Sequence, residues 1–191
     1  MGSRQESALS TYRVLVSIVW VGLILLCAYL GIGTAAGMIN PRLFRPILAG
    51  SPWGPGIALG IPWDSLTAAQ WRAFGISVGL WSLVGGLLGL AAVDQVRRIL
   101  SSASDKTPFT RVNVDRMRNA GLAVFGVAAA KAFRDLAFAS FVGANVKVPG
   151  IEVMYVTDLG LATAFIGLMV LAVAEVMRHG VRLQDDEDLT V

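Results

Sequence analysis

Four separate apolar segments dominate the sequence, and they restrict the chain to a membrane fold. They cover residues 14–33, 74–93, 121–143 and 159–177. A helix rises about 1.5 Å per residue, so about 20 apolar residues cross the roughly 30 Å hydrocarbon layer of a bilayer. Charged residues make up only 15% of the chain, whereas soluble domains average about 25%. The sequence therefore predicts an all-α integral membrane protein, a bundle of four transmembrane helices.

The chain is predicted to form a single membrane domain over residues 1–191. In chain order we expect a span at 14–33, an outer loop at 34–73, a span at 74–96, a cytoplasmic loop at 97–118, a span at 119–143, an outer loop at 144–158, a span at 159–178 and a cytoplasmic tail at 179–191. Asp64 or Ser65 is expected to cap the second helix, and Thr110 the helix that precedes the third span. Gly180 is placed to end the last helix in the left-handed conformation.

The distribution of positive charge predicts which side of the membrane each segment faces. Loops rich in lysine and arginine stay in the cytoplasm. Basic residues concentrate in the N-terminal segment, the loop at 97–118 and the tail, and the two outer loops are poorer in them. We therefore expect both termini and the middle loop to be cytoplasmic.

The second outer loop carries a different pattern. The stretch "NVKVPGIEVMYV" alternates apolar and polar residues around Pro149 and Gly150. This alternation is typical of two short strands joined by a turn. We expect a small β or loop cap on the outer face; the alternative is a lid over a ligand site.

The chain is poor in residues that commonly carry catalysis or bind metals. Cys27 is the only cysteine and His179 the only histidine. An intramolecular disulfide, a zinc site built from cysteine pairs and a histidine-rich site are therefore excluded. The sequence also holds no phosphate-binding loop and no evident nucleophile–base pair. We predict a protein that is not an enzyme and that needs no cofactor or metal.

Charged residues inside the third span form a first candidate site. Lys131, Arg134 and Asp135 lie there, and Glu175 lies near the cytoplasmic end of the fourth span. A charge at the centre of the bilayer costs about 2.5–3.5 kcal/mol on insertion scales, so such residues need partners or water. Lys131 and Asp135, four residues apart, share a helix face. The cluster pairs structurally, serves a small transporter or channel, or forms a ligand site.

Opposite charges on two predicted cytoplasmic segments form a second candidate site. The loop contributes Arg111, Arg116 and Arg118. The tail contributes an acidic and apolar end, consisting of Asp185, Asp186, Glu187, Asp188, Leu189 and Val191. The tail could fold back onto the loop, bind a basic partner, or remain a solvated end; the loop could also contact anionic lipid heads.

Small residues four apart favour close helix packing. The pairs are Gly75 with Gly79, Gly85 with Gly89, and Gly160 with Ala164. Such spacing lets two helices approach closely. We expect the packing to lie within one bundle; a homo-oligomer is the alternative.

Two stretches resemble a known family. They are "DKTPFTRVNVDRMRNAG" before the third span and "AEVMRHGVRLQDDEDLTV" at the C-terminus. Together they resemble the bacterial four-helix membrane proteins called domain of unknown function 2975. The family pattern often has an aromatic residue where Met177 stands and an acid where His179 stands. The resemblance implies a bacterial inner-membrane location and work alongside a small cytoplasmic helix-turn-helix repressor.

These observations lead to one functional hypothesis and one alternative. We expect a non-enzymatic tether or regulator of a cytoplasmic partner, such as a helix-turn-helix transcriptional regulator. Such a protein would contact the lipid bilayer and would not bind nucleic acid directly. The alternative is a small transporter or channel that uses the charged cluster of the third span.

Overall fold

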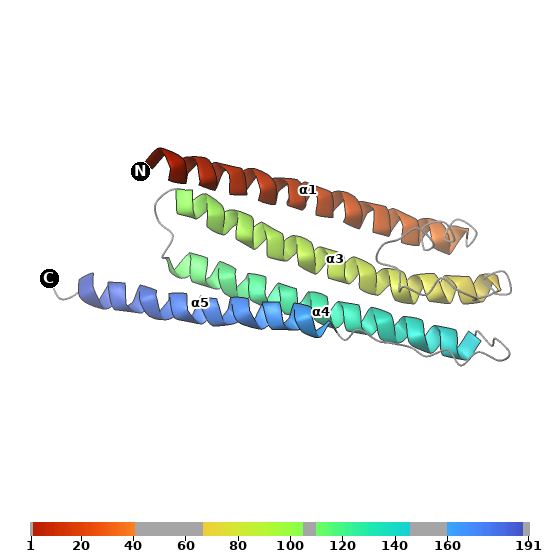
Figure 1. Ribbon diagram of the computed structural model, residues 1–191. Helices are drawn as coiled ribbons and strands as arrows, with labels where there is room; N and C mark the ends of the chain where they lie inside the picture. The colour runs from red at the N-terminus through yellow and green to blue at the C-terminus, as the bar shows by residue number, and fades with distance from the viewer. Residues whose placement is uncertain (1, 41–66, 105–109, 146–159, 189–191) are drawn as a thin grey trace.

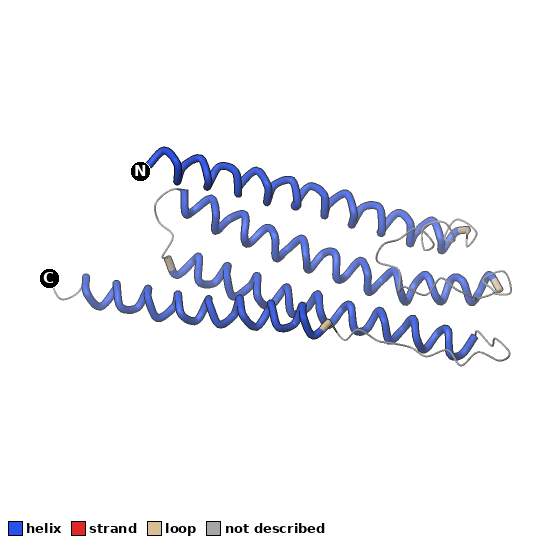
Figure 2. The backbone as a smooth tube through the Cα atoms, in the orientation of Figure 1, coloured by secondary structure: helices blue, strands red, loops and turns tan. Residues whose placement is uncertain are grey.

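The computed structural model describes residues 2–40, 67–104, 110–145 and 160–188. Within these residues the chain forms four α-helices: α1 (Gly2–Ile39), α3 (Ala68–Ser104), α4 (Arg111–Asn145) and α5 (Leu161–Asp188) (Figures 1 and 2). The described part of the chain is helical apart from short helix-flanking residues, so the all-α part of the predicted fold class is confirmed there. The expected β cap at residues 146–158 lies outside the described residues.

Three of the helices are long and apolar enough to cross a membrane. The apolar stretches run over Thr11–Ile39, Ala68–Ser102 and Leu161–Leu183. α4 is long enough but too charged, because its longest uncharged stretch covers only residues 119–130. The molecule is therefore a helical membrane protein with at least three helices of membrane-spanning character.

The helices pack in the order in which they occur in the chain. α1 packs on α3, α3 on α4, and α4 on α5, and these are the substantial helix pairs among the described residues. Neighbouring helices run in opposite directions (Figure 1). One end of the row, which we call the basic end, therefore holds the start of α1, the end of α3, the start of α4 and the end of α5. The arrangement is a row of antiparallel helices.

The helices are longer than the predicted spans. α3 continues through Ser104 and α4 starts at Arg111, so most of the predicted loop at 97–118 is helical. α5 runs through Gly180 to Asp188, so the prediction that Gly180 ends this helix was wrong. Among the described glycines only Gly160 has a positive φ, of 66°. Gly180 is thus an ordinary helical residue, and helical neighbours on both sides outweigh its weak preference for helix.

Threonine caps begin two of the helices. Thr110 accepts hydrogen bonds from the Asn113 amide through both its carbonyl and its hydroxyl oxygen, which confirms its predicted role. At α3 the cap is Thr67. Its amide and hydroxyl both donate to Gln70 Oε1, and the Gln70 amide donates back to the hydroxyl at 3.3 Å. This capping box places the helix start after the predicted caps, which lie outside the described residues.

Close contacts at glycines join neighbouring helices of the row, and among the glycines of the predicted spacing Gly79 makes such a contact. A Cβ on Gly79 would lie 2.6 Å from the Thr34 hydroxyl, and one on Gly86 would lie 2.8 Å from the Cys27 sulfur. One on Gly121 would lie 2.8 Å from Leu171 Cγ. These glycines pack against neighbouring helices of the same chain, so they serve packing within the row.

Aromatic side chains fill the α3–α4 contact at the opposite end of the molecule. Phe74 is only 1% exposed. Its ring lies 5.6 Å from that of Phe138 and 4.8 Å from that of Phe141, and Trp71 contacts it edge-on at 6.0 Å. Such aromatic contacts contribute beyond the buried area itself. They fix the register of α3 against α4 and so set where the residues of the basic end meet.

α5 is offset along α4. A Cβ on Gly160, directly before α5, would lie 3.2 Å from the Ala128 carbonyl oxygen, near the middle of α4. From this point α5 runs beside the first half of α4 and continues past its first residue (Figure 1). The offset places the charged C-terminal half of α5 at the basic end.

Candidate functional site

A buried asparagine fastens the α3–α4 hairpin at the basic end. Asn113 is 0% exposed, and its Nδ2 donates to Ser102 Oγ at 2.8 Å. Arg116 Nη1 donates to Asn113 Oδ1 at 3.1 Å and to the Arg98 carbonyl at 3.4 Å. A buried amide needs such partners, since leaving it unpaired would cost about 1–3 kcal/mol. The motif "TRVN" thus has a structural role, and Arg116 turns toward α3.

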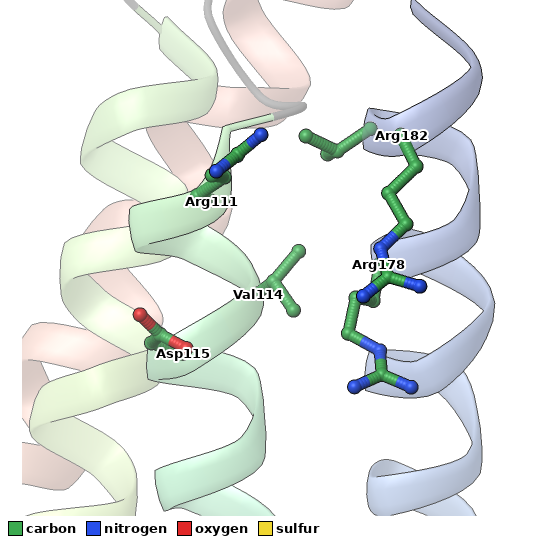
Figure 3. Close-up of a pocket in the computed structure, with 6 residues that line it drawn as sticks. Arg111, Val114, Asp115, Arg178 and Arg182 are labelled. Atoms are coloured by element: carbon green, nitrogen blue, oxygen red, sulfur yellow. The ribbon is translucent and has the colours of Figure 1, made fainter. Parts of the chain in front are cut away.

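A groove lined by arginines runs between α4 and α5 at the same end. Figure 3 shows arginine side chains from both helices around the space over Val114. The groove consists of two adjoining hollows of about 330 and 270 Å³ that share Val114, Asp115 and Arg178. The described residues that line this arginine groove are Arg111, Val114, Asp115, Arg118, Leu171, Ala174, Glu175, Arg178, Val181 and Arg182.

Helical spacing explains why these side chains share one groove. On α4 the lining residues Arg111, Asp115 and Arg118 are separated by four and three positions. On α5, Leu171, Glu175, Arg178 and Arg182 repeat the same spacing, and residues three or four apart lie on one helix face. Val114, Ala174 and Val181 are buried between the helices. The groove therefore has an apolar floor and charged walls.

The charges of the groove do not cancel. Among its described lining residues four arginines face two carboxylates, which leaves a net charge of +2. Arg178 pairs with Glu175, and His179 Nδ1 lies 3.7 Å from the same carboxylate. Among the described residues, Arg118 and Arg182 have no ion pair. Two guanidinium groups are thus available to an anionic ligand.

α5 extends beyond the groove. Arg182 shares the groove with Arg111, the first residue of α4, and α5 continues through Asp188. Residues 183–188, which we call the α5 extension, add about 9 Å of helix. The acidic positions Asp185 to Asp188 therefore lie on a helix that points past α4 (Figure 1), and as far as Asp188 the tail does not fold back onto the start of α4. Leu189 and Val191 lie outside the described residues.

The charged residues of the predicted third span pair with one another. Arg134 donates to Asp135 Oδ1 through Nε at 3.0 Å and Nη2 at 2.8 Å. Lys131 Nζ lies 3.8 Å from Asp135 Oδ2. The side chains of Arg134 and Asp135 are only 12% and 14% exposed. Glu175 is not part of this cluster, because it lies in the groove at the basic end, level with Arg118.

The structure separates the predicted partner-binding arginines. Arg111 and Arg118 line the groove, whereas Arg116 belongs to the hairpin fastening.

In the described ranges, no three His, Cys, Asp or Glu side chains come together in the way that a metal ion requires.

The chain matches a protein-family model over nearly its whole length. The model of the family described as protein of unknown function (DUF2975) matches residues 8–191. The chain belongs to this family. No curated protein and no solved structure matches it. The matched range includes the hairpin fastening, the arginine groove and the α5 extension of this DUF2975 member.

The sequence analysis did not predict Arg178 and Arg182 as site residues. Arg178 and Arg182 stand four apart on α5, but the expected helix end at Gly180 separated them. A continuous helix puts both on one face, opposite Arg111 and Arg118. The spacing was visible in the sequence, whereas the neighbouring helix was not.

Proposed function

We propose that this DUF2975 protein is a non-enzymatic membrane tether that docks a basic cytoplasmic partner on the α5 extension. The observation that carries the proposal is the continuity of α5 from Leu161 to Asp188. A helix that begins in an apolar segment and ends in four acidic positions holds those positions at a fixed place beyond the other helices. A docking element needs such preorganisation, because a flexible tail loses conformational entropy on binding.

The proposal includes a four-span topology with both termini in the cytoplasm. α4 packs on α3 and on α5, which both have membrane-spanning character. Its Asp135 is engaged by Lys131 and Arg134, which reduces the cost of placing these charges in a bilayer. The basic end gathers arginines from α3, α4 and α5, as the cytoplasmic side of a membrane protein does. The bacterial inner membrane is the location that fits this arrangement and the family resemblance.

A helix-turn-helix regulator fits the chemistry of the extension. The surface with which such a protein binds DNA is cationic, because it neutralises phosphates. An acidic helix held outside the membrane would occupy the same surface, so the partner would be held or released in competition with DNA. The mutual pairing of the charged residues in α4, with Glu175 elsewhere, favours a structural role for that cluster over transport.

The test is recovery of a partner from native membranes. The tagged full-length protein is purified under mild crosslinking beside a variant in which Asp185, Asp186, Glu187 and Asp188 become Asn, Asn, Gln and Asn. The expected result is a DNA-binding protein that is recovered with the unchanged chain and lost with the neutral variant. Adding duplex DNA before crosslinking should lower its recovery.

A matched control removes residues 189–191 and keeps the acids. This control should retain the partner, since the proposal assigns binding to the acidic positions. Equal recovery of the partner with the neutral variant would overturn the proposal. Labelling of single cysteines placed at residues 3 and 190, in a Cys27→Ser background, with a membrane-impermeant maleimide tests the topology. Labelling from the outside would contradict it.

A further inference from the structure

We propose that the arginine groove between α4 and α5 binds the headgroup of an anionic phospholipid. Arginine presents several N–H donors in a planar fork that matches the oxygens of a phosphate. The groove offers such forks from both helices, and the net charge of its described lining residues is +2. Basic pockets between membrane helices commonly hold anionic headgroups in this way. This inference concerns a different surface from the α5 extension and does not rest on the proposed partner.

The position of the groove along α5 fits the headgroup layer of a bilayer. The apolar part of α5 starts at Leu161, and Glu175 is its first charged residue. Leu171 lines the deep end of the groove, and Arg182 lines the other end near the start of α4. The groove thus begins among residues at acyl-chain depth and ends among charged residues. A membrane surface supplies lipid headgroups at this level.

An apolar track continues the groove and favours a lipid over a free anion or an acidic peptide. Leu122 follows Arg118 by four positions on the same face of α4 and is 52% exposed. Leu168 precedes Leu171 by three positions on α5 and is 55% exposed. Residues at this spacing lie in line on a helix. A molecule with a phosphate at one end and an acyl chain at the other matches both parts, whereas a soluble anion matches only the arginines.

The two carboxylates of the groove have separate effects. Glu175 pairs with Arg178, so it orients one guanidinium group. Asp115 lines both hollows, and no ion pair of its carboxylate occurs among the described residues. Its negative charge therefore weakens anion binding without orienting an arginine through an ion pair. Removing that charge should strengthen lipid binding, an effect that misfolding would not produce.

The experiment measures lipid binding to the purified full-length protein by native mass spectrometry in detergent. The probes are dioleoylphosphatidylglycerol, which is anionic, and dioleoylphosphatidylcholine, which is zwitterionic. The unchanged protein should bind the anionic lipid preferentially. Arg118→Gln combined with Arg182→Gln should weaken that binding about 30-fold, since each arginine near an anionic surface contributes about fivefold. Asp115→Asn should strengthen it by up to about fivefold.

The matched control removes two exposed arginines outside the groove, through Arg13→Gln and Arg98→Gln. This control should bind the anionic lipid as the unchanged protein does. Equal weakening in the control and in the groove variant would overturn the inference, because surface charge alone would then explain binding. Absence of any preference between the two lipids would also overturn it. So would complete displacement of the lipid by millimolar inorganic phosphate, since the ligand would then be free phosphate.

Discussion

Replacing Gly180 with alanine should stabilise the α5 extension. Gly180 lies inside α5, and a Cβ built on it meets nothing within 4 Å. The substitution therefore changes only the helix preference of the backbone. Alanine is more favourable than glycine in a helix interior by about 1 kcal/mol. The population of molecules in which the helical turns after residue 180 are locally unfolded should thus fall about fivefold.

Proline at the same position should have the opposite effect. Gly180→Pro removes one helical hydrogen bond, and its ring meets the carbonyl four residues earlier, at a cost of about 3 kcal/mol or more. The opening of residues 181–188 should become roughly 150-fold more frequent, or complete. Recovery of the partner should fall with it, because the acidic positions would no longer be held in place.

Amide hydrogen exchange of residues 181–188 measures both effects on the purified protein in nanodiscs. Exchange should be slower in Gly180→Ala and faster in Gly180→Pro than in the unchanged chain. The alanine variant distinguishes a continuous α5 from a helix that ends at Gly180. If Gly180 ended the helix in the left-handed conformation, alanine would cost about 1–2 kcal/mol there. Faster exchange in Gly180→Ala would therefore refute a continuous α5.

Three further predictions concern the packing of the row. Gly86→Ala should destabilise the protein by about 1–3 kcal/mol in a thermal melt, because its methyl group would press on a sulfur of α1. Gly89→Ala, whose Cβ would meet a side chain only at 4.0 Å, should be neutral or stabilising; equal loss in both would contradict the packing. Asn113→Ala should cost about 2–4 kcal/mol in the same melt, since it removes the hydrogen bond to Ser102 of α3 and the acceptor of Arg116 within α4; an unchanged melting temperature would rule that fastening out. Asp135→Asn should cost about 3–5 kcal/mol, because two partly buried cations lose their carboxylate. Glu175→Gln, in an exposed pair, should cost less than about 1 kcal/mol. The reverse order of these two costs would show that the α4 cluster is not a structural one.

The apolar segments and the Thr110 cap were the parts of the fold that the sequence could predict. Hydropathy located the helices, since a run of about 20 apolar residues indicates a membrane-spanning helix. Thr110 was recognisable because its side chain acts on the adjacent turn alone. The helix ends were harder to predict, because polar residues and glycine can lie inside a helix as well as at its end. Gly180 shows this: its preference for a helix end is about 1 kcal/mol, less than the contribution of the surrounding turns.

The sequence could predict the individual charged residues of the candidate site but not how they are grouped in space. The arginines of the basic end and the charges of α4 were visible as positions along the chain. Their grouping depends on which helix lies next to which, and on the offset that sets Gly160 beside Ala128. That offset places Glu175 against Arg118 rather than near Asp135. Helix order and offset arise from close contacts such as that between Gly121 and Leu171, which no local pattern specifies.

The sequential packing of the helices has a consequence for biosynthesis. Among the described residues, each helix after α1 has its main contacts with the described helix that precedes it in the chain. When α3 leaves the ribosome, α1 is already in place to receive it, and α4 and α5 follow in the same way. None of the four described helices depends mainly on a partner that is distant in the chain. Chains with such local contacts fold quickly and present few chances for misassembly. Among these helix contacts, the groove between α4 and α5 is therefore the last to form, because it needs the last of the four described helices.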